Sequence, residues 1–232
     1  MPMLSCRLPP PAIVPHVKIC GVTRAEDAML ALTLGASFIG LILTKKSPRY
    51  VSLEAAEAIV REVRVDFRNA RFIGVFVDED PADMVVALER VGLCGVQVHG
   101  PVEPLSWVVP PDCAIPALAF RTEEQADHAA TMLETFSGIV ADAFSPDRTG
   151  GTGVVFDHQL VLPLLRRGKV FVAGGLKPEN IEQVVHSFPP GRLPYAFDLS
   201  SGVESAPGIK SPERLKLFFE RYRRALMEQP TT

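Results

Sequence analysis

Eight short apolar segments alternate with longer amphipathic segments along almost the whole 232-residue chain, and this alternation constrains the fold more than any other feature. Short apolar runs separated by helical patterns are typical of parallel strands joined by helices. The apolar segments occupy residues 17–20, 36–43, 71–77, 94–100, 114–120, 138–143, 169–175 and 195–202. Eight such units in a chain of this length predict an α/β fold, a single-domain (β/α)8 barrel with parallel strands.

The predicted helices carry residues that start or stop helices. Thr23 with Glu26, and Thr122 with Gln125, have the spacing of a capping box. The helix expected within 156–168 is less distinct because Pro163 interrupts its pattern. A doubly wound sheet is the alternative arrangement, but the first strand is followed by CGVTRA and not by a dinucleotide-binding GxGxxG turn.

The overall charge and hydropathy exclude some partners. A net charge of −3 and a pI near 6.0 give no reason to expect a nucleic-acid partner. No apolar run reaches the roughly 18–20 residues that span a bilayer. The proline-rich start, MPMLSCRLPPPAIVPH, is unlike a signal peptide, so we expect residues 1–16 to be a flexible extension before a catalytic domain at 17–227.

The cysteines and histidines show no spacing that suggests a metal site. The four cysteines, at positions 6, 20, 94 and 113, form no CxxC pair. A chain of this size does not depend on disulfides, so we expect reduced thiols, a cytoplasmic location and no metal.

Polar side chains stand where the predicted strands end. Cys20, His99 and Asp142 end the first, fourth and sixth strands, and Arg49 follows the second. In a (β/α)8 barrel the active site lies at this carboxyl-terminal rim. Because side chains alternate along a strand, Lys18 should share the inward face with Cys20, and Gln97 should share it with His99. The alternatives are a core-filling Cys20, a loop-capping Asp142 and a purely structural His99.

Three glycine-rich stretches lie at or just after the ends of the last three predicted strands. They contain Gly150–Gly151, Gly174–Gly175 and Ser201–Gly202. Exposed backbone N–H groups in such loops suit an anion, and loops after the seventh and eighth strands of these barrels often bind phosphate. Together the loops indicate a phosphorylated small molecule.

The motifs KICGVT, SPRYVS, VQVHG, GGTG…FD, AGGLKPENI and DLSSGVES–PGIK occur in this order over nearly the whole chain. In order and spacing they resemble the phosphoribosylanthranilate isomerase family of tryptophan biosynthesis. The resemblance implies an Amadori rearrangement without a metal or organic cofactor. It also implies that Cys20 is the general base and Asp142 the general acid.

Further roles follow from the resemblance together with side-chain chemistry. Arg49 has the fork geometry to hold the anthranilate carboxylate, His99 should line the pocket, and Lys18 is the candidate to stabilise a Cys20 thiolate. The expected substrate-binding residues are Arg49, His99, Gly150, Gly151, Gly174, Gly175, Ser201 and Gly202. We expect no nucleic-acid or membrane partner, and either a monomer or a homodimer.

Two other functions remain open at this point. The related Amadori isomerase of histidine biosynthesis uses the same barrel, but by resemblance it has aspartates at both catalytic positions, whereas this chain has Cys20. A catalytically inactive barrel that only binds a phosphorylated ligand would need neither Cys20 nor Asp142.

Overall fold

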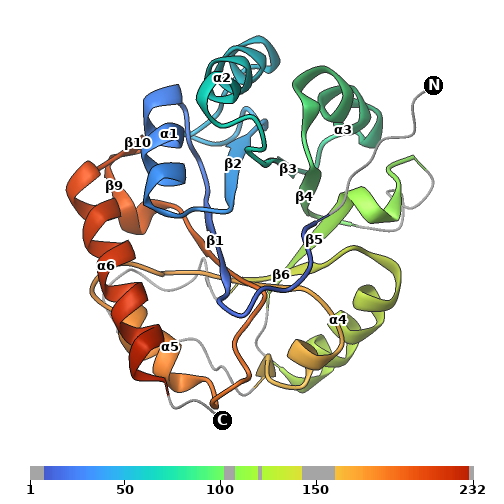
Figure 1. Cartoon of the computed structure of the whole chain (residues 1–232). Helices are drawn as coiled ribbons and strands as arrows, with labels where there is room; N and C mark the ends of the chain where they lie inside the picture. The colour runs from blue at the N-terminus through green and yellow to red at the C-terminus, as the bar shows by residue number, and fades with distance from the viewer. Residues whose placement is uncertain (1–7, 102–107, 120–121, 143–159, 230–232) are drawn as a thin grey trace.

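The computed structural model describes residues 8–101, 108–119, 122–142 and 160–229, and its eight main strands form a closed parallel barrel (Figure 1). These strands are β1 (His16–Ile19), β2 (Phe38–Ile42), β3 (Phe72–Val77), β4 (Gly95–His99), β5 (Ala114–Ala119), β6 (Ile139–Asp142), β7 (Val170–Ala173) and β8 (Ala196–Leu199). Strand β8 also pairs with β1, with Ile19 opposite Leu199. This closure confirms the predicted (β/α)8 barrel and excludes an open sheet.

Helices surround the barrel on the outside (Figure 1). They are α1 (Ala25–Leu34), α2 (Leu53–Asp66), α3 (Pro81–Ala87), α4 (Glu123–Thr135), α5 (Ile181–Ser187) and α6 (Pro212–Glu228). The main hydrophobic core lies between helices and strands, and it contains Val17 and Ile19 of β1 and Val96 and Val98 of β4. Within the described ranges, no helix combines the length and hydrophobicity needed to span a bilayer.

One of the two predicted capping boxes is present. At the start of α4 the Gln125 N–H donates to the Thr122 hydroxyl, and the Thr122 N–H donates to the Gln125 side chain. The box predicted for Thr23 and Glu26 is wrong, since Arg24 is the N-cap of α1 and has no side-chain cap. The Thr23 hydroxyl instead donates to the Gly208 carbonyl at 2.6 Å. The Thr23 hydroxyl therefore makes a long-range hydrogen bond instead of the local helix cap that the sequence pattern predicted.

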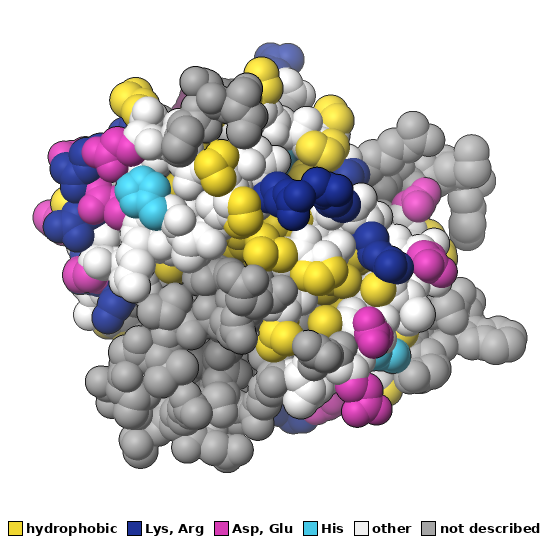
Figure 2. Space-filling model, turned by 90° about the horizontal axis from the view of Figure 1, so that it is seen from below, with side chains coloured by type: hydrophobic (Ala, Val, Ile, Leu, Met, Phe, Trp, Pro, Cys, Tyr) yellow, Lys and Arg dark blue, Asp and Glu magenta, His cyan; other side chains and the backbone are white. Residues whose placement is uncertain are grey.

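The connection from β6 to β7 differs from the prediction of a helix within 156–168. Residues 156–159 lie outside the described residues, and the described part contains only the 3-10 turn η5 (Leu164–Arg166). Apolar side chains of this connection, Leu162 and Leu165, pack against the same core as Leu133 of α4. Figure 2 views this side of the molecule and shows hydrophobic side chains between charged ones.

A second, smaller core cluster fills the amino-terminal end of the barrel. It consists of Leu8, Phe38, Ile73, Ile115, Val140, Phe171, Ala173, Tyr195 and Ala196. Phe38, Ile73, Ile115 and Phe171 come from four different strands, and all four are almost fully buried. They occupy inward positions and pack together at this end.

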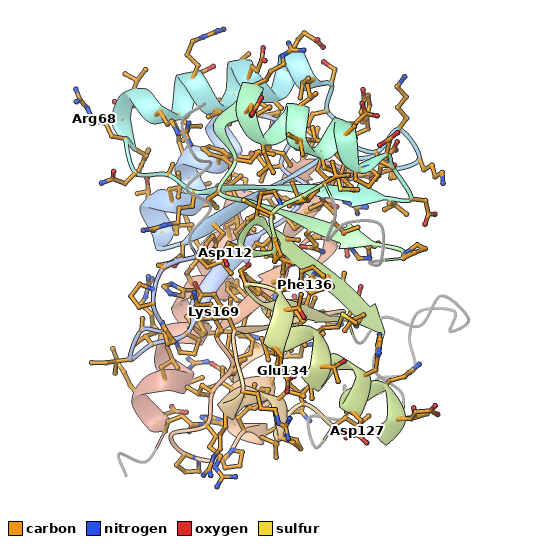
Figure 3. The ribbon with its side chains drawn as sticks, turned by 90° about the vertical axis from the view of Figure 1, so that its right-hand side faces the viewer. Arg68, Asp112, Asp127, Glu134, Phe136 and Lys169 are labelled. Carbon is orange, nitrogen blue, oxygen red and sulfur yellow. The ribbon has the colours of Figure 1, made fainter. Side chains whose placement is uncertain are left out.

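The segment before β1 closes this end of the barrel. Figure 1 shows it crossing the barrel opening. The Leu8 side chain is 5% exposed, the Leu8 carbonyl accepts a hydrogen bond from Lys169, and the Pro9 carbonyl accepts one from the Tyr195 hydroxyl at 2.9 Å. Figure 3 shows Lys169 and Asp112 on this same side. Leu8 and Pro9 of the predicted extension are therefore held against the barrel, whereas residues 10–14 are exposed.

The expectation that all thiols are reduced is also wrong in one place. Cys113 is disulfide-bonded in the structure. Among the described residues the free cysteines are Cys20, which is buried, and Cys94.

Candidate active site

Polar side chains occupy the inward positions just beyond the apolar cluster. Lys18 extends across the barrel interior from β1 and donates to Gln97 of β4 at 2.9 Å and to Asp198 of β8 at 2.7 Å. These contacts confirm the predicted inward face of Lys18 and Gln97. Since Cys20 and His99 stand two residues further along the same strands, they share this face at the carboxyl-terminal rim.

Cys20 lies in a space that a glycine leaves for it. It directly follows β1, its N–H donates to the Leu199 carbonyl at 2.7 Å, and only 7% of its surface is exposed. A Cβ on Gly40 of β2 would come within 2.8 Å of the Cys20 sulfur. Sequence reasoning missed Gly40, although a glycine inside the apolar strand FIGLI is a signal of close approach.

The Cys20 side chain is a thiol in the resting site. Burial raises its pKa, and the positive charges of Lys18 and Lys210 oppose this effect without cancelling it. Lys18 therefore lowers the pKa of Cys20, as expected of a residue that stabilises a thiolate, but burial raises that pKa by more. Formation of the thiolate requires a proton acceptor or further positive charge from the bound substrate complex.

Lys18 is charged despite complete burial. Burial lowers its pKa, but the neighbouring Asp198 carboxylate outweighs that effect and raises the pKa above its usual value. The ion pair has 1% and 5% of its two side chains exposed. Within the described residues, the second oxygen of Asp198, Oδ1, is buried without a hydrogen-bond partner. Asp198 is thus an inward, buried partner of Lys18 that retains one acceptor atom.

Gln97 determines how His99 is protonated. A lysine ammonium has only donors, so the Gln97 oxygen must face Lys18 and the Gln97 NH2 group must face the other way. That NH2 group lies 2.9 Å from Nε2 of His99, which must then be the unprotonated acceptor. Burial also lowers the pKa of His99, opposed mainly by the charge of Asp142. His99 is therefore neutral, and its proton is on Nδ1.

Asp142 is the last residue of β6 and stands opposite Ala173 of β7. It is partly exposed, in contrast to the buried Asp198. Its charge acts on both His99 and Asp198. The structure therefore brings Asp142 to the same rim as Cys20 and His99, as the sequence predicted.

Arg49 is held by an acidic residue that the sequence analysis did not single out. Its guanidinium donates through Nε and Nη2 to Glu204, the first residue of β9 (Glu204–Ala206), with the shortest distance 2.7 Å. The Arg49 stem lies over Gly21, where a Cβ would come within 2.6 Å of its Cδ. Arg49 is thus placed directly beside the backbone that follows Cys20.

The glycine-rich loops lie at the same rim. Gly174 and Gly175 have φ of 95° and 66°, a conformation that favours glycine, and the space around Gly175 is open. Ser201 and Gly202 begin the 3-10 turn η6 (Ser201–Val203), so the turn itself provides no partner for their N–H groups. A Cβ on Gly202 would lie 1.9 Å from the Leu176 carbonyl oxygen. Gly202 is therefore also required for the loop after β8 to contact the loop after β7.

Some predicted features cannot be placed. Gly150 and Gly151 lie outside the described residues. Among the described residues, no three His, Cys, Asp or Glu side chains are arranged to hold a metal ion.

Acid–base side chains at the carboxyl-terminal rim of a closed parallel barrel are the arrangement of (β/α)8-barrel enzymes, and this chain is one of them. A family model described as N-(5'phosphoribosyl)anthranilate (PRA) isomerase matches residues 17–221. The chain therefore belongs to the PRA isomerase family and is an isomerase of tryptophan biosynthesis.

Individual relatives agree with this assignment. N-(5'-phosphoribosyl)anthranilate isomerase of Thiobacillus denitrificans is 36% identical over 212 residues, which cover 89% of this chain and 97% of the relative. The enzyme of Myxococcus xanthus is 39% identical over 208 residues, covering 88% and 93% of the two chains. The crystal structure of the Thermotoga maritima enzyme matches with a TM-score of 0.79 and 33% identity, over 91% of this chain and 100% of that chain.

Proposed function

We propose that the carboxyl-terminal rim catalyses the Amadori rearrangement of N-(5-phospho-β-D-ribosyl)anthranilate to 1-(2-carboxyphenylamino)-1-deoxy-D-ribulose 5-phosphate. The observation that carries this proposal is the inward placement of Cys20, His99 and the strand-ending Asp142 at one rim. A related crystal structure is a complex of PRA isomerase with reduced 1-(o-carboxyphenylamino)-1-deoxyribulose 5-phosphate, at 31% identity and a TM-score of 0.76. The reaction needs no metal or organic cofactor.

The two proposed catalytic residues act in sequence. Asp142, as general acid, gives a proton to the ribose ring oxygen while the bond from that oxygen to C1 breaks and the nitrogen lone pair forms a C=N bond. Cys20, as general base, then removes the proton from C2, which gives an enol with a C1=C2 double bond. The Cys20 thiol then returns a proton to C1, and the C2 hydroxyl loses its proton to Asp142, which forms the ketone and restores both residues. The whole process is thus an isomerisation without net loss of atoms.

Burial makes the proton transfers at Cys20 sensitive to the surrounding charges. Its thiol must lose a proton before it can act as base, and burial opposes that loss. The ammonium groups of Lys18 and Lys210 favour the thiolate. The neutral His99 keeps a proton on Nδ1, which makes it a donor for a substrate oxygen.

The substrate's two anionic ends are assigned to separate parts of the rim. Arg49 holds the anthranilate carboxylate through its free donors. The phosphate lies on the loop backbones, and its proposed residues are Gly174, Gly175, Ser201 and Gly202, with Gly150 and Gly151 as further candidates.

We also propose residues 17–227 as the catalytic domain and a cytoplasmic location. The Thermotoga maritima relative is described as dimeric, and for this chain a monomer and a homodimer are both compatible with the proposal.

The test is to generate the anthranilate adduct in situ and to follow the loss of its fluorescence. We expect wild-type turnover, and a fall in kcat of roughly 10²–10⁴-fold in Cys20→Ser and in Asp142→Asn. Cys94→Ser is the matched control, because Cys94 is also a free cysteine and burial raises its pKa to about 12. Absence of wild-type turnover would reject the function. Near-full activity in either catalytic variant would reject that residue's role.

A further inference from the structure

Glu204 sits between two cations at the edge of the proposed site. Its Oε1 accepts from Lys210 Nζ at 2.8 Å, from Arg49 Nε at 2.9 Å and from the Gly208 N–H at 3.2 Å. Its Oε2 accepts from Arg49 Nη2 at 2.7 Å. The Glu204 side chain is only 5% exposed. Its carboxylate is saturated with protein donors, so it is poorly suited to bind a ligand itself.

Lys210 fixes Glu204 from the protein side. It belongs to β10 (Ile209–Lys210), and its side chain is fully buried. Its ammonium has three donors, and these reach the Cys20 carbonyl at 2.6 Å, the Ser200 carbonyl at 3.2 Å and Glu204. Every donor is used, so Lys210 has no freedom to move toward a ligand. It ties the backbone of Cys20 and the loop after β8 to the carboxylate that holds Arg49.

Arg49 retains one unused edge. The Nε–Nη2 edge is occupied by Glu204, and within the described residues Nη1 makes no hydrogen bond. A guanidinium can bind a second carboxylate through its Nη1–Nη2 edge. The Arg49 side chain is 21% exposed, so that edge is accessible from the rim. Because Glu204 balances only one of two cations, the group also retains one net positive charge.

We infer that Glu204 is a positioning residue, which orients Arg49 so that its Nη1–Nη2 edge receives the aromatic carboxylate of the substrate. This inference rests on the proposed function. It specifies which residue orients Arg49 in the proposed carboxylate subsite. The arrangement fits the electrostatics, since hydrogen bonding to Glu204 raises the pKa of Arg49 further. The Arg49 stem on Gly21 and the Lys210 bond to the Cys20 carbonyl link this subsite to the residue that carries the base.

The test measures substrate kinetics and carboxylate preference in Glu204→Gln. The probes are the reduced product analogue and the same compound without its carboxyl group. We expect KM to rise about tenfold, with kcat changed less than about twofold. Preference for the carboxylated analogue should fall by a similar factor. Glu204→Asp should recover part of the loss, because it restores the charge. Glu182→Gln is the matched control, since Glu182 pairs with Arg224 on the exposed face of α5 and α6.

A double-mutant cycle with Arg49→Met shows whether Glu204 acts through Arg49. If it does, adding Glu204→Gln to Arg49→Met changes KM little. An undiminished tenfold effect in that background would overturn the inference, as would a KM unchanged in Glu204→Gln. If Arg49→Met itself leaves the carboxylate preference intact, the proposed Arg49 subsite fails. If the wild type turns over no substrate, the proposed function fails instead.

Discussion

The two ends of the barrel fill equivalent inward positions with opposite kinds of side chain. At the amino-terminal end, the rings of Phe38 and Phe171 lie 5.6 Å apart, and Tyr195 lies 5.2 Å from Phe171. At the carboxyl-terminal end, Lys18 and Asp198 form a buried ion pair. The change occurs within single strands, at successive inward positions.

Strands β2 and β8 illustrate this change. Phe38 belongs to the apolar cluster, whereas Gly40, two residues on, leaves space for Cys20. Ala196 belongs to the same cluster, and Asp198 is the next inward residue. The amino-terminal end is therefore suited to stabilise the barrel. The carboxyl-terminal end contains buried polar groups, which lower stability but can transfer protons. Mutations at the two ends should separate these contributions.

The largest effect on stability should come from Lys18→Met. The substitution leaves the Asp198 charge buried without its partner, so we expect the free energy of unfolding to fall by about 3–5 kcal/mol. Urea denaturation of both proteins measures the difference. The double variant Lys18→Met/Asp198→Leu should regain much of the loss, because it removes both charges. A loss below about 1 kcal/mol in the single variant would contradict a tightly paired interior.

Leu8→Ala should have a smaller effect, confined to the amino-terminal end. Removing a buried leucine side chain from the inner cluster should lower the free energy of unfolding by about 2 kcal/mol. The kinetic constants should not change, because the proposed site lies at the opposite rim. Ile13→Ala is the control, since Ile13 is in the same segment but fully exposed. Equal stabilities for the two variants would show that residues 8–15 do not support the barrel.

Periodicity in the sequence was enough to predict the barrel and the inward face of its strands. It places Lys18 with Cys20 and Gln97 with His99, because a two-residue period is a local property of the chain. The Thr122 capping box was predictable for the same reason.

Contacts between distant segments were not predictable in this way. Arg49 and Glu204 are 155 positions apart, and Lys169 and Leu8 are 161 apart. No local pattern specifies which partner a buried charge will find, and for Thr23 a distant carbonyl replaced the local cap. Proline-rich composition likewise suggested a flexible start, whereas Leu8 is buried in the inner cluster.

The pH dependence of catalysis should change with a mutation at the carboxyl-terminal end of the barrel and stay the same with a mutation at the amino-terminal end. Burial raises the pKa of Cys20, and the proposed base is active only when deprotonated. In the substrate complex, kcat should therefore rise with pH, about tenfold per pH unit, as long as the proposed acid Asp142 carries its proton, and level off only above the usual thiol pKa of about 8.5. Leu8→Ala should keep this rising limb, because Leu8 lies at the opposite end of the barrel.

The residual activity of Cys20→Ser provides the decisive control for this limb. A serine hydroxyl does not ionise in the accessible range, so its profile should be flat where the wild type rises. A rising limb that persists in Cys20→Ser would assign the titration to another group. A wild-type limb complete below pH 7 would mean that the surrounding cations, and not burial, dominate at Cys20. In that case the carboxyl-terminal end would be arranged to hold a thiolate before substrate arrives.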